Sequence, residues 1–206
     1  MTAAQGPYRS LSLADAPAVL ALMCRAEGGL GRLPHEMDLA WAEETLGHAI
    51  GDGVAVGAWI DDRLAGVIKA CRMPSVQFQH VLWDLTVAVD PDFQGRGIGR
   101  GLFEALFATV ATLTPKVERI ELVVREGLGH AIRLYESLGF RLEGRFERRF
   151  HLADGRYESR SCDGQISISE AVTGRRRRTS CASSDLQLTH LHERPAKAPQ
   201  WCPTRP

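Results

Sequence analysis

Apolar positions along most of the chain alternate between strand-like and helix-like spacing. Residues 8–13 alternate apolar and polar side chains, which predicts a short strand. Asp15 suits the N-cap of a following helix that has Pro17 in its first turn and ends before the glycine pair at 28–29. Residues 38–50 show a second amphipathic pattern, so the chain is predicted to open as a strand followed by two helices.

The middle of the chain is predicted to be a hairpin, a long strand and a helix. Two apolar runs, 54–60 and 64–72, flank the turn sequence Asp-Asp-Arg. Residues 80–89 alternate as one longer strand, and a helix follows a glycine-rich loop. The apolar face predicted for the strand comprises Val81, Trp83, Leu85, Val87 and Val89, and the apolar stripe of the helix comprises Ile98, Leu102, Phe103, Leu106, Phe107 and Val110.

The remaining elements complete a mixed pattern of helices and strands. Residues 120–126 predict a strand, residues 130–140 a helix closed by Gly139, and residues 141–152 with 156–159 a final hairpin. This order of elements favours a mixed α/β layer over a bundle or a repeat.

Composition excludes some classes of function. The chain is 44% hydrophobic and 24% charged with a formal net charge of zero, which argues against a nucleic-acid or membrane surface over the core domain. No apolar run approaches the roughly 18–20 residues needed to span a bilayer. The start of the sequence lacks the features of a signal peptide, so we expect a cytoplasmic location. The five cysteines are widely spaced without a CxxC pair, which predicts free thiols and no metal site.

The last 46 residues have a different character. Residues 161–206 hold seven Lys/Arg and four Asp/Glu, including four consecutive arginines at 175–178. Their composition is rich in Arg, Ser, Pro and Thr and cannot bury enough surface to offset its ordering entropy. We therefore expect a low-complexity tail that is disordered from about residue 171. The arginine run is either a nucleic-acid or localisation patch or merely a solvated segment.

The most distinctive segment is the glycine-rich loop DPDFQGRGIGRGLF at residues 90–103. A strand that leads through glycines into a helix presents unpaired backbone N–H groups and the positive end of the helix dipole, which together favour a bound anion. The glycine spacing does not fit the dinucleotide-binding fingerprint, and no Gly-Lys-Ser/Thr is present for a Walker loop. A phosphate or pyrophosphate group is the predicted ligand.

Two motifs resemble the signatures of the GNAT superfamily of N-acetyltransferases. The segment QGRGIG at 94–99 matches the acetyl-CoA signature Gln/Arg-x-x-Gly-x-Gly/Ala, and AIRLYESLGF at 131–140 matches the second signature of the family. The resemblance covers roughly residues 8–157 and predicts an N-acetyltransferase domain at 6–160. It implies an α/β fold with a central, mostly antiparallel twisted sheet that is splayed at the cofactor-binding strand and flanked by about four helices.

The resemblance also implies how acetyl-CoA binds. The backbone of the strand at 85–89 would pair with the pantetheine arm, and the N–H groups of 94–100 would hold the pyrophosphate. A backbone N–H near Val87 or Val89 would polarise the thioester carbonyl. The implied cofactor-binding residues are Leu85, Val87, Ala88, Val89, Gln94, Gly95, Arg96, Gly97, Ile98, Gly99, Arg100, Ala131 and Leu134.

The resemblance and the residue chemistry suggest an acid and several bases. Tyr135 is the predicted general acid for the leaving thiolate, because a phenol with a pKa of about 10 is protonated at neutral pH. Asp84 is the first candidate for the general base and Glu121 the second, while His80 and His130 remain open, as does a base reached through water. Each candidate base also has a purely structural interpretation.

Three positions depart from the pattern of the family. Val123 stands where some ribosomal-protein acetyltransferases carry a glutamate base, and Leu128 stands where many relatives have asparagine. The third departure follows residue 159, where the polar sequence RSCDG replaces an apolar strand that inserts between two others. One hypothesis is that the chain after about Arg160 is the product of an altered reading frame.

Together these patterns predict an N-acetyltransferase that transfers the acetyl group of acetyl-CoA to a primary amine. The acceptor is expected to be a small molecule or the N-terminus or a lysine of a protein, without a metal. We expect its pocket to be shaped by the segment 25–50, which includes His35, Glu36 and Trp41, and by Phe78, His80 and Trp83 opposite. No acidic cluster indicates a polyamine. The alternative is a CoA-binding module with little turnover. The family suggests a monomer or a homodimer.

Overall fold

Seven strands form one sheet in the order β1-β2-β3-β4-β5-β7-β6, within a computed structural model that describes residues 7–26, 32–151 and 155–164. All neighbouring strands are antiparallel except β4 and β5, which are parallel. The strands are β1 (Tyr8–Ser10), β2 (Gly53–Ile60), β3 (Arg63–Arg72), β4 (Val81–Val89), β5 (Arg119–Arg125), β6 (Arg141–His151) and β7 (Tyr157–Gly164).

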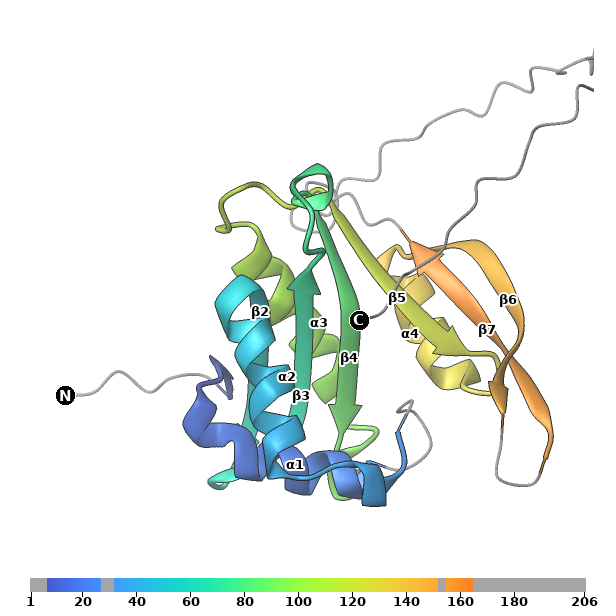
Figure 1. The fold of residues 1–206 in the computed structure, drawn as a ribbon. Coiled ribbons are helices and arrows are strands. Elements are labelled where there is room, and N and C mark those ends of the chain that lie inside the picture. The colour runs from blue at the N-terminus through green and yellow to red at the C-terminus, as the bar shows by residue number, and fades with distance from the viewer. Residues whose placement is uncertain (1–6, 27–31, 152–154, 165–206) are drawn as a thin grey trace, which may run out of the picture. The chain divides into compact units, whose positions relative to one another are not determined.

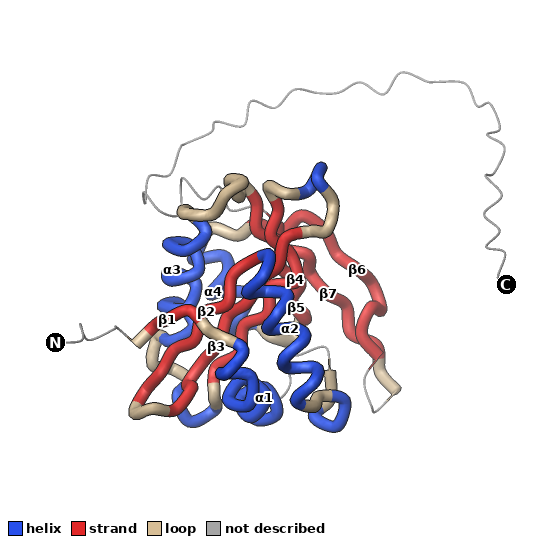
Figure 2. The backbone as a smooth tube through the Cα atoms, turned by 60° about the vertical axis from the view of Figure 1, so that its left-hand side comes forward, coloured by secondary structure: helices blue, strands red, loops and turns tan. Residues whose placement is uncertain are grey.

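Four α-helices cover the two faces of the sheet (Figures 1 and 2). They are α1 (Ala16–Arg25), α2 (Leu39–Asp52), α3 (Ile98–Val110) and α4 (Gly129–Leu138). One core lies between the sheet and α1 with α2, and a second core lies between the sheet and α3 with α4. The pleat separates these two cores: along β2, Val54 and Val56 belong to the α3 side while Ala55 belongs to the α1 side. The predicted mixed α/β fold is thereby confirmed.

The pattern in α3 shows why sequence periodicity predicted its position. All six apolar residues of the predicted stripe are buried, and Leu102, Phe103 and Leu106 are fully buried. α4 ends as predicted, because Gly139 takes a left-handed φ of 99° at its C-cap. At the start of α1 the prediction was wrong in detail. Asp15 occupies the N-cap position but its carboxylate accepts hydrogen bonds from Ser12 and Arg9 instead of capping the helix.

β4 and β5 pair only at their beginnings. The paired residues are Val81 with Arg119 and Leu82 with Ile120, and beyond them the two strands diverge. Figure 1 shows the resulting V, which opens toward the end of β4 that leads into the glycine-rich loop. The splay predicted at this strand is confirmed.

A bulge in β4 changes the face predicted for its apolar residues. Pairing with β3 shifts between Lys69 and Cys71, and Asp84 in the bulge has a positive φ of 50°. Because the bulge adds one residue, Leu82 joins Leu85 on the α3 side, whereas Trp83 does not share that face and is 42% exposed. The single apolar face predicted from 81 to 89 is therefore wrong before residue 84.

β7 occupies the position between β5 and β6 that the polar sequence after residue 159 made doubtful. It pairs with β5 from Arg160 to Gly164 and with β6 along most of its length. The ladder hydrogen bonds are made by main-chain groups, so an apolar side-chain pattern is not needed to form them. The strand predicted to end at residue 159 therefore extends to Gly164, and of the tail predicted at 161–206 the residues from 165 onward lie outside the described residues.

Two further expectations, on the cysteines and on membrane spans, can be compared with the described residues. Cys24 and Cys71 are free thiols, as expected of them. No helix within the described ranges is long and apolar enough to cross a bilayer.

Candidate active site

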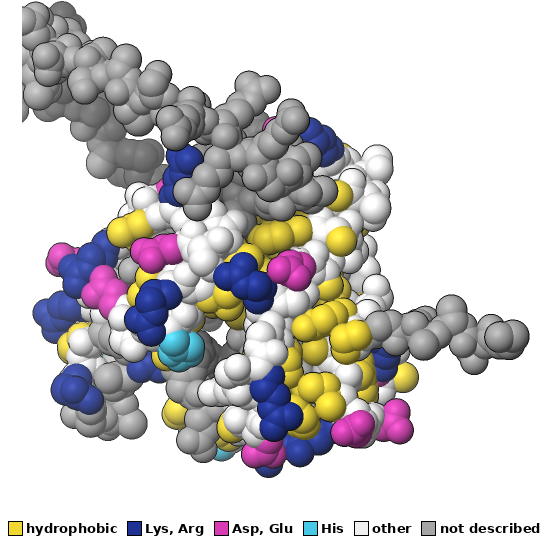
Figure 3. Space-filling model, turned by 180° about the vertical axis from the view of Figure 1, so that it is seen from behind, with side chains coloured by type: hydrophobic (Ala, Val, Ile, Leu, Met, Phe, Trp, Pro, Cys, Tyr) yellow, Lys and Arg dark blue, Asp and Glu magenta, His cyan; other side chains and the backbone are white. Residues whose placement is uncertain are grey.

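A cleft of about 960 Å³ lies between the diverging halves of β4 and β5. The glycine-rich loop and the start of α3 line one end, α4 lines one side, and further residues come from α2 and from Ala26, Arg32 and Met37 before it. In the rear view of Figure 3 the surface is hollowed between the part that carries α4 and the part that carries α3. The predicted site residues that line the cleft are Asp84, Leu85, Val87, Ala88, Val89, Gln94, Gly95, Gly97, Ile98, Gly99, Arg100, Ala131, Leu134 and Tyr135.

The glycine-rich loop has the geometry of an anion-binding turn. Gly95 and Gly97 have left-handed φ values of 74° and 79°, which other residues rarely adopt, and open space surrounds both sites where a Cβ would stand. Gly97 is the N-cap of α3 and provides no side-chain hydrogen bond to the first turn. The backbone of this turn therefore borders open space at the cleft, where a helix N-terminus offers N–H groups without intrahelical partners.

Arg96 and Arg100 lie beside this turn but are held by protein contacts. The Arg96 guanidinium lies 5.2 Å from the ring centroid of Phe93 and is not among the residues that line the cleft. Arg100 lines the cleft and donates a 2.6 Å hydrogen bond to Ser137 of α4. The two arginines add positive charge near the turn.

A buried carboxylate fixes the segment that leads into the glycine-rich loop. Asp90 accepts hydrogen bonds from Arg25 at the end of α1 and from Arg63 at the start of β3, and its side chain also accepts from the N–H of Asp92. Burial raises the pKa of Asp90, but these hydrogen bonds outweigh it and hold the pKa at about 2. The link joins the end of β4 to two neighbouring elements.

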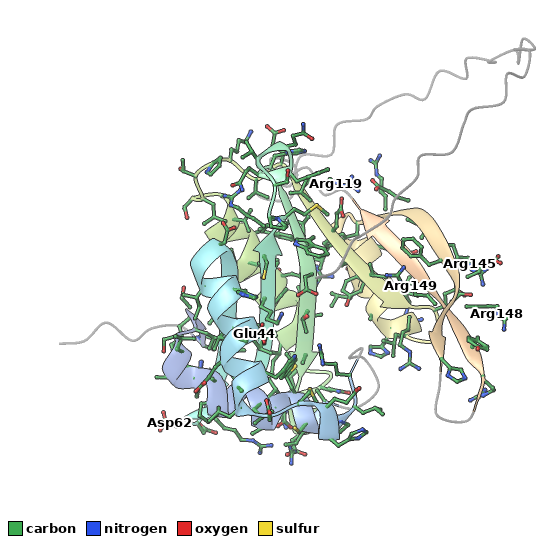
Figure 4. All side chains as sticks on the ribbon, viewed as in Figure 1. Glu44, Asp62, Arg119, Arg145, Arg148 and Arg149 are labelled. Atoms are coloured by element: carbon green, nitrogen blue, oxygen red, sulfur yellow. The ribbon has the colours of Figure 1, made fainter. Side chains whose placement is uncertain are left out.

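This ionised carboxylate predicts loss of stability in acid. Because the pKa of Asp90 is lower in the folded state than its usual 3.8, its stabilising effect is complete above about pH 5 and is lost as pH falls toward 2. We expect Asp90→Asn to lower the melting temperature at pH 7 and to flatten the decline between pH 5 and 2. Thermal denaturation across that range measures both effects. Asp62→Asn, at the exposed turn labelled in Figure 4, should keep the wild-type slope, and an equally steep slope in Asp90→Asn would contradict the assignment.

The cleft edge of β4 carries Asp84, the first candidate for the general base. The bulge exposes its side chain to 61%, and its Oδ2 lies 3.5 Å from the Nζ of Lys69 on β3. Lys69 also lines the cleft and is only 4% exposed. Sequence analysis missed Lys69, because a single lysine in an apolar strand gives no signal that it faces a cleft.

Tyr135 lies on α4 with its side chain 7% exposed and still borders the cleft. Its ring packs edge-on against Phe103 and Phe140, with centroid distances of 5.6 and 5.9 Å. These ring contacts fix the position of the phenol at the side of the cleft. Its place at the cleft agrees with the predicted role as a general acid, and its ring contacts agree with a packing role.

Glu121, the second candidate for the base, is engaged elsewhere. Its carboxylate accepts a 2.6 Å hydrogen bond from Arg119, which also binds Glu143 of β6, and it is not among the residues that line the cleft. Figure 4 shows Arg119 at the end of β5 where the V is closed. The hydrogen bonds that Arg119 donates to Glu143 and Glu121 raise the pKa of Arg119. Val123, at the position of the glutamate base in some relatives, does line the cleft.

Of the other predicted positions, some line the cleft and others do not. His130 and Leu128 line it, and Trp41 of the predicted acceptor segment does so together with Met37 and Thr45. The remaining acceptor candidates are not among its lining residues; these are His35, Glu36, Phe78, His80 and Trp83. Within the described part of the chain no group of His, Cys, Asp and Glu is arranged to hold a metal ion, and the expectation of metal-free chemistry stays a prediction.

Comparison with known proteins identifies the family. The model of the acetyltransferase (GNAT) family matches residues 20–140, which is more than half of the chain. The chain belongs to the GNAT family. Among solved structures, the ribosomal-protein-alanine N-acetyltransferase of Brucella melitensis is 25% identical with a TM-score of 0.68, covering 77% of this chain and 98% of that one. A putative acetyltransferase of Salmonella typhimurium, solved with acetyl-CoA, shares the fold at 19% identity and a TM-score of 0.67, covering 86% and 100%.

Curated relatives of this GNAT chain match a short region. The ribosomal protein bS18-alanine N-acetyltransferase of Salmonella typhimurium is 44% identical over 73 residues, which cover 34% of this chain and 48% of that protein. A probable spermine N(1)-acetyltransferase of Bacillus subtilis subsp. natto is 39% identical over 59 residues, covering 29% and 38%. The chain thus spans less than half the length of these two relatives, whose acceptors differ from one another.

Proposed function

We propose that this chain is an N-acetyltransferase that transfers the acetyl group of acetyl-CoA to a primary amine. The observation that carries the proposal is the cleft itself, which brings together the glycine-rich turn, the unpaired half of β4 and Tyr135. Bound acetyl-CoA supplies an activated acetyl thioester, so the protein needs only to position the reactants, move protons and stabilise charge.

The binding half of the proposal rests on main-chain groups. The N–H groups of residues 94–100 would hold the diphosphate at the start of α3, where Gly95 and Gly97 leave room for it. The half of β4 that lacks β5 as a partner would pair with the extended pantetheine arm. A backbone N–H near Val87 or Val89 would stabilise negative charge on the carbonyl oxygen.

The proposed catalysis needs two proton transfers, which we assign to Asp84 and Tyr135. Asp84 would accept a proton from the amine, directly or through water, because an alkyl ammonium must lose a proton before its nitrogen can attack. The new bond joins the amine nitrogen to the acetyl carbon and the carbon–sulfur bond breaks. Tyr135 would donate its phenolic proton to the departing sulfur. Glu121 is the weaker candidate for the base because Arg119 holds its carboxylate outside the cleft lining.

A thiol-release assay with a panel of amines tests this proposal. We expect acetyl-CoA to raise the melting temperature, and free CoA thiol to appear at a rate that depends on the added amine. A rise in melting temperature without thiol release for any amine would identify a CoA-binding module instead. No effect of acetyl-CoA on either measurement would contradict the proposed function altogether.

A further inference from the structure

The part of the cleft that Lys69 lines lies on the α1–α2 face of the sheet, and we assign the acceptor to it. Along β3, Ile68 belongs to the core of the α3 side and Val67 to the core of the α1 side, so the pleat places Lys69 on the α1 side. Lys69 is in register with Thr86 of β4, and both line the cleft. Figure 1 shows α2 in front of β3 at this face.

The charged side chains at this end of the cleft include more cations than carboxylates, although the expected acceptor is an amine. Lys69 is buried, and its Nζ lies 3.5 Å from Asp84, which is beyond an ordinary charge-assisted hydrogen bond. Asp84 is the single carboxylate among the described residues that line the cleft, whereas Arg32 supplies another cation. A polyamine would therefore meet more positive than negative charge here, which opposes its binding.

We propose that the acceptor is a small amine that carries a carboxylate close to its amino group, as an α-amino acid does. This inference rests on the proposed function and adds the acceptor class to it. The amino group of such a molecule would lie at Asp84, which takes its proton, and its carboxylate would lie at Lys69. Burial of a cation with one distant partner favours a second anion beside it, because a poorly paired buried charge is costly.

The cleft that holds this ion pair also has an apolar wall on the α2 side. Met37 is 8% exposed and Trp41 of α2 is half-buried, and both line the cleft with Thr45 one turn further along α2. The Arg32 guanidinium lies 6.0 Å from the ring centroid of Trp41, so it stands at the same wall. We therefore expect amino acids with apolar side chains to be better acceptors than glycine.

Matched pairs of acceptors test the role of Lys69. Thiol release at saturating acetyl-CoA is measured with glycine, leucine and phenylalanine, with the amide of each, and with spermine. We expect kcat/KM for leucine or phenylalanine to exceed that of its amide by at least about tenfold, the size of one charge-assisted contact. In Lys69→Met, which conserves volume in a buried position, the ratio should fall to about one through a higher KM for the amino acid. Lys69→Arg should keep part of the preference.

The control variant is Lys116→Met, which removes a lysine whose side chain is 79% exposed and which is not among the cleft-lining residues. It should keep the wild-type ratio, and the melting temperature of each variant with and without CoA verifies folding and cofactor binding. Equal rates for acids and amides in the wild type, an unchanged ratio in Lys69→Met, or spermine as the best acceptor would overturn the acceptor class while leaving the transferase activity intact. Absence of thiol release with every amine would overturn both.

Discussion

Tyr135→Phe is expected to lower kcat for acetyl transfer about 100-fold, the lower range for loss of a general acid. Phenylalanine keeps the ring that packs against Phe103 and Phe140 and removes only the hydroxyl that would protonate the departing thiolate. Affinity for CoA should therefore stay close to that of the wild type. Single-turnover thiol release measures the first effect, and isothermal titration calorimetry measures the second.

Tyr157→Phe is the matched control for this experiment. Tyr157 is 51% exposed on β7, stacks on His151 and is not among the residues that line the cleft, so its hydroxyl should be dispensable for acetyl transfer. If Tyr135→Phe transfers acetyl groups at the wild-type rate, then the tyrosine has only a packing role and the acid must be sought elsewhere.

Gly97→Val should weaken CoA binding by at least about tenfold. The left-handed φ of 79° costs an L-residue roughly 1–2 kcal/mol, and a branched side chain would occupy the open space in front of the first turn of α3. Relaxation of the backbone would also turn the N–H groups away from the diphosphate. Calorimetric titration of CoA into the purified variant measures the change in Kd.

Gly155→Ala is the control that distinguishes the effect of backbone strain on stability from an effect on CoA binding. Gly155 also has a left-handed φ, of 81°, but it lies in the connection between β6 and β7 and is not among the residues that line the cleft. This variant should lose some stability while its Kd for CoA is unchanged. A Gly97→Val protein with wild-type affinity would contradict the assignment of this turn to the diphosphate.

Much of this fold follows from local patterns in the sequence. The helix α3 was predicted correctly because its buried stripe repeats at helical spacing, and the β2–β3 hairpin because two apolar runs flank a short polar turn. Most predicted cofactor-binding residues line one cleft for a related reason: a strand, a glycine-rich turn and a helix are consecutive in the chain. Their roles in binding remain proposals until they are tested.

The features that the sequence did not predict depend on tertiary structure. The bulge at Asp84 adds one residue to a strand whose composition is otherwise regular, and no local pattern announces it. Lys69 owes its importance to burial and to a partner on the neighbouring strand, neither of which its own segment specifies. The extension of β7 to Gly164 depends on main-chain pairing with two strands, which side-chain composition reports poorly.

The divergence of β4 from β5 also bears on aggregation through exposed strand edges. Strand edges with free N–H and C=O groups ordinarily invite pairing with another polypeptide and so promote aggregation. In this fold such an edge stands inside a cleft, with β5 and α4 on the opposite side. The walls of the cleft thus cover this edge on the side from which another strand would have to approach.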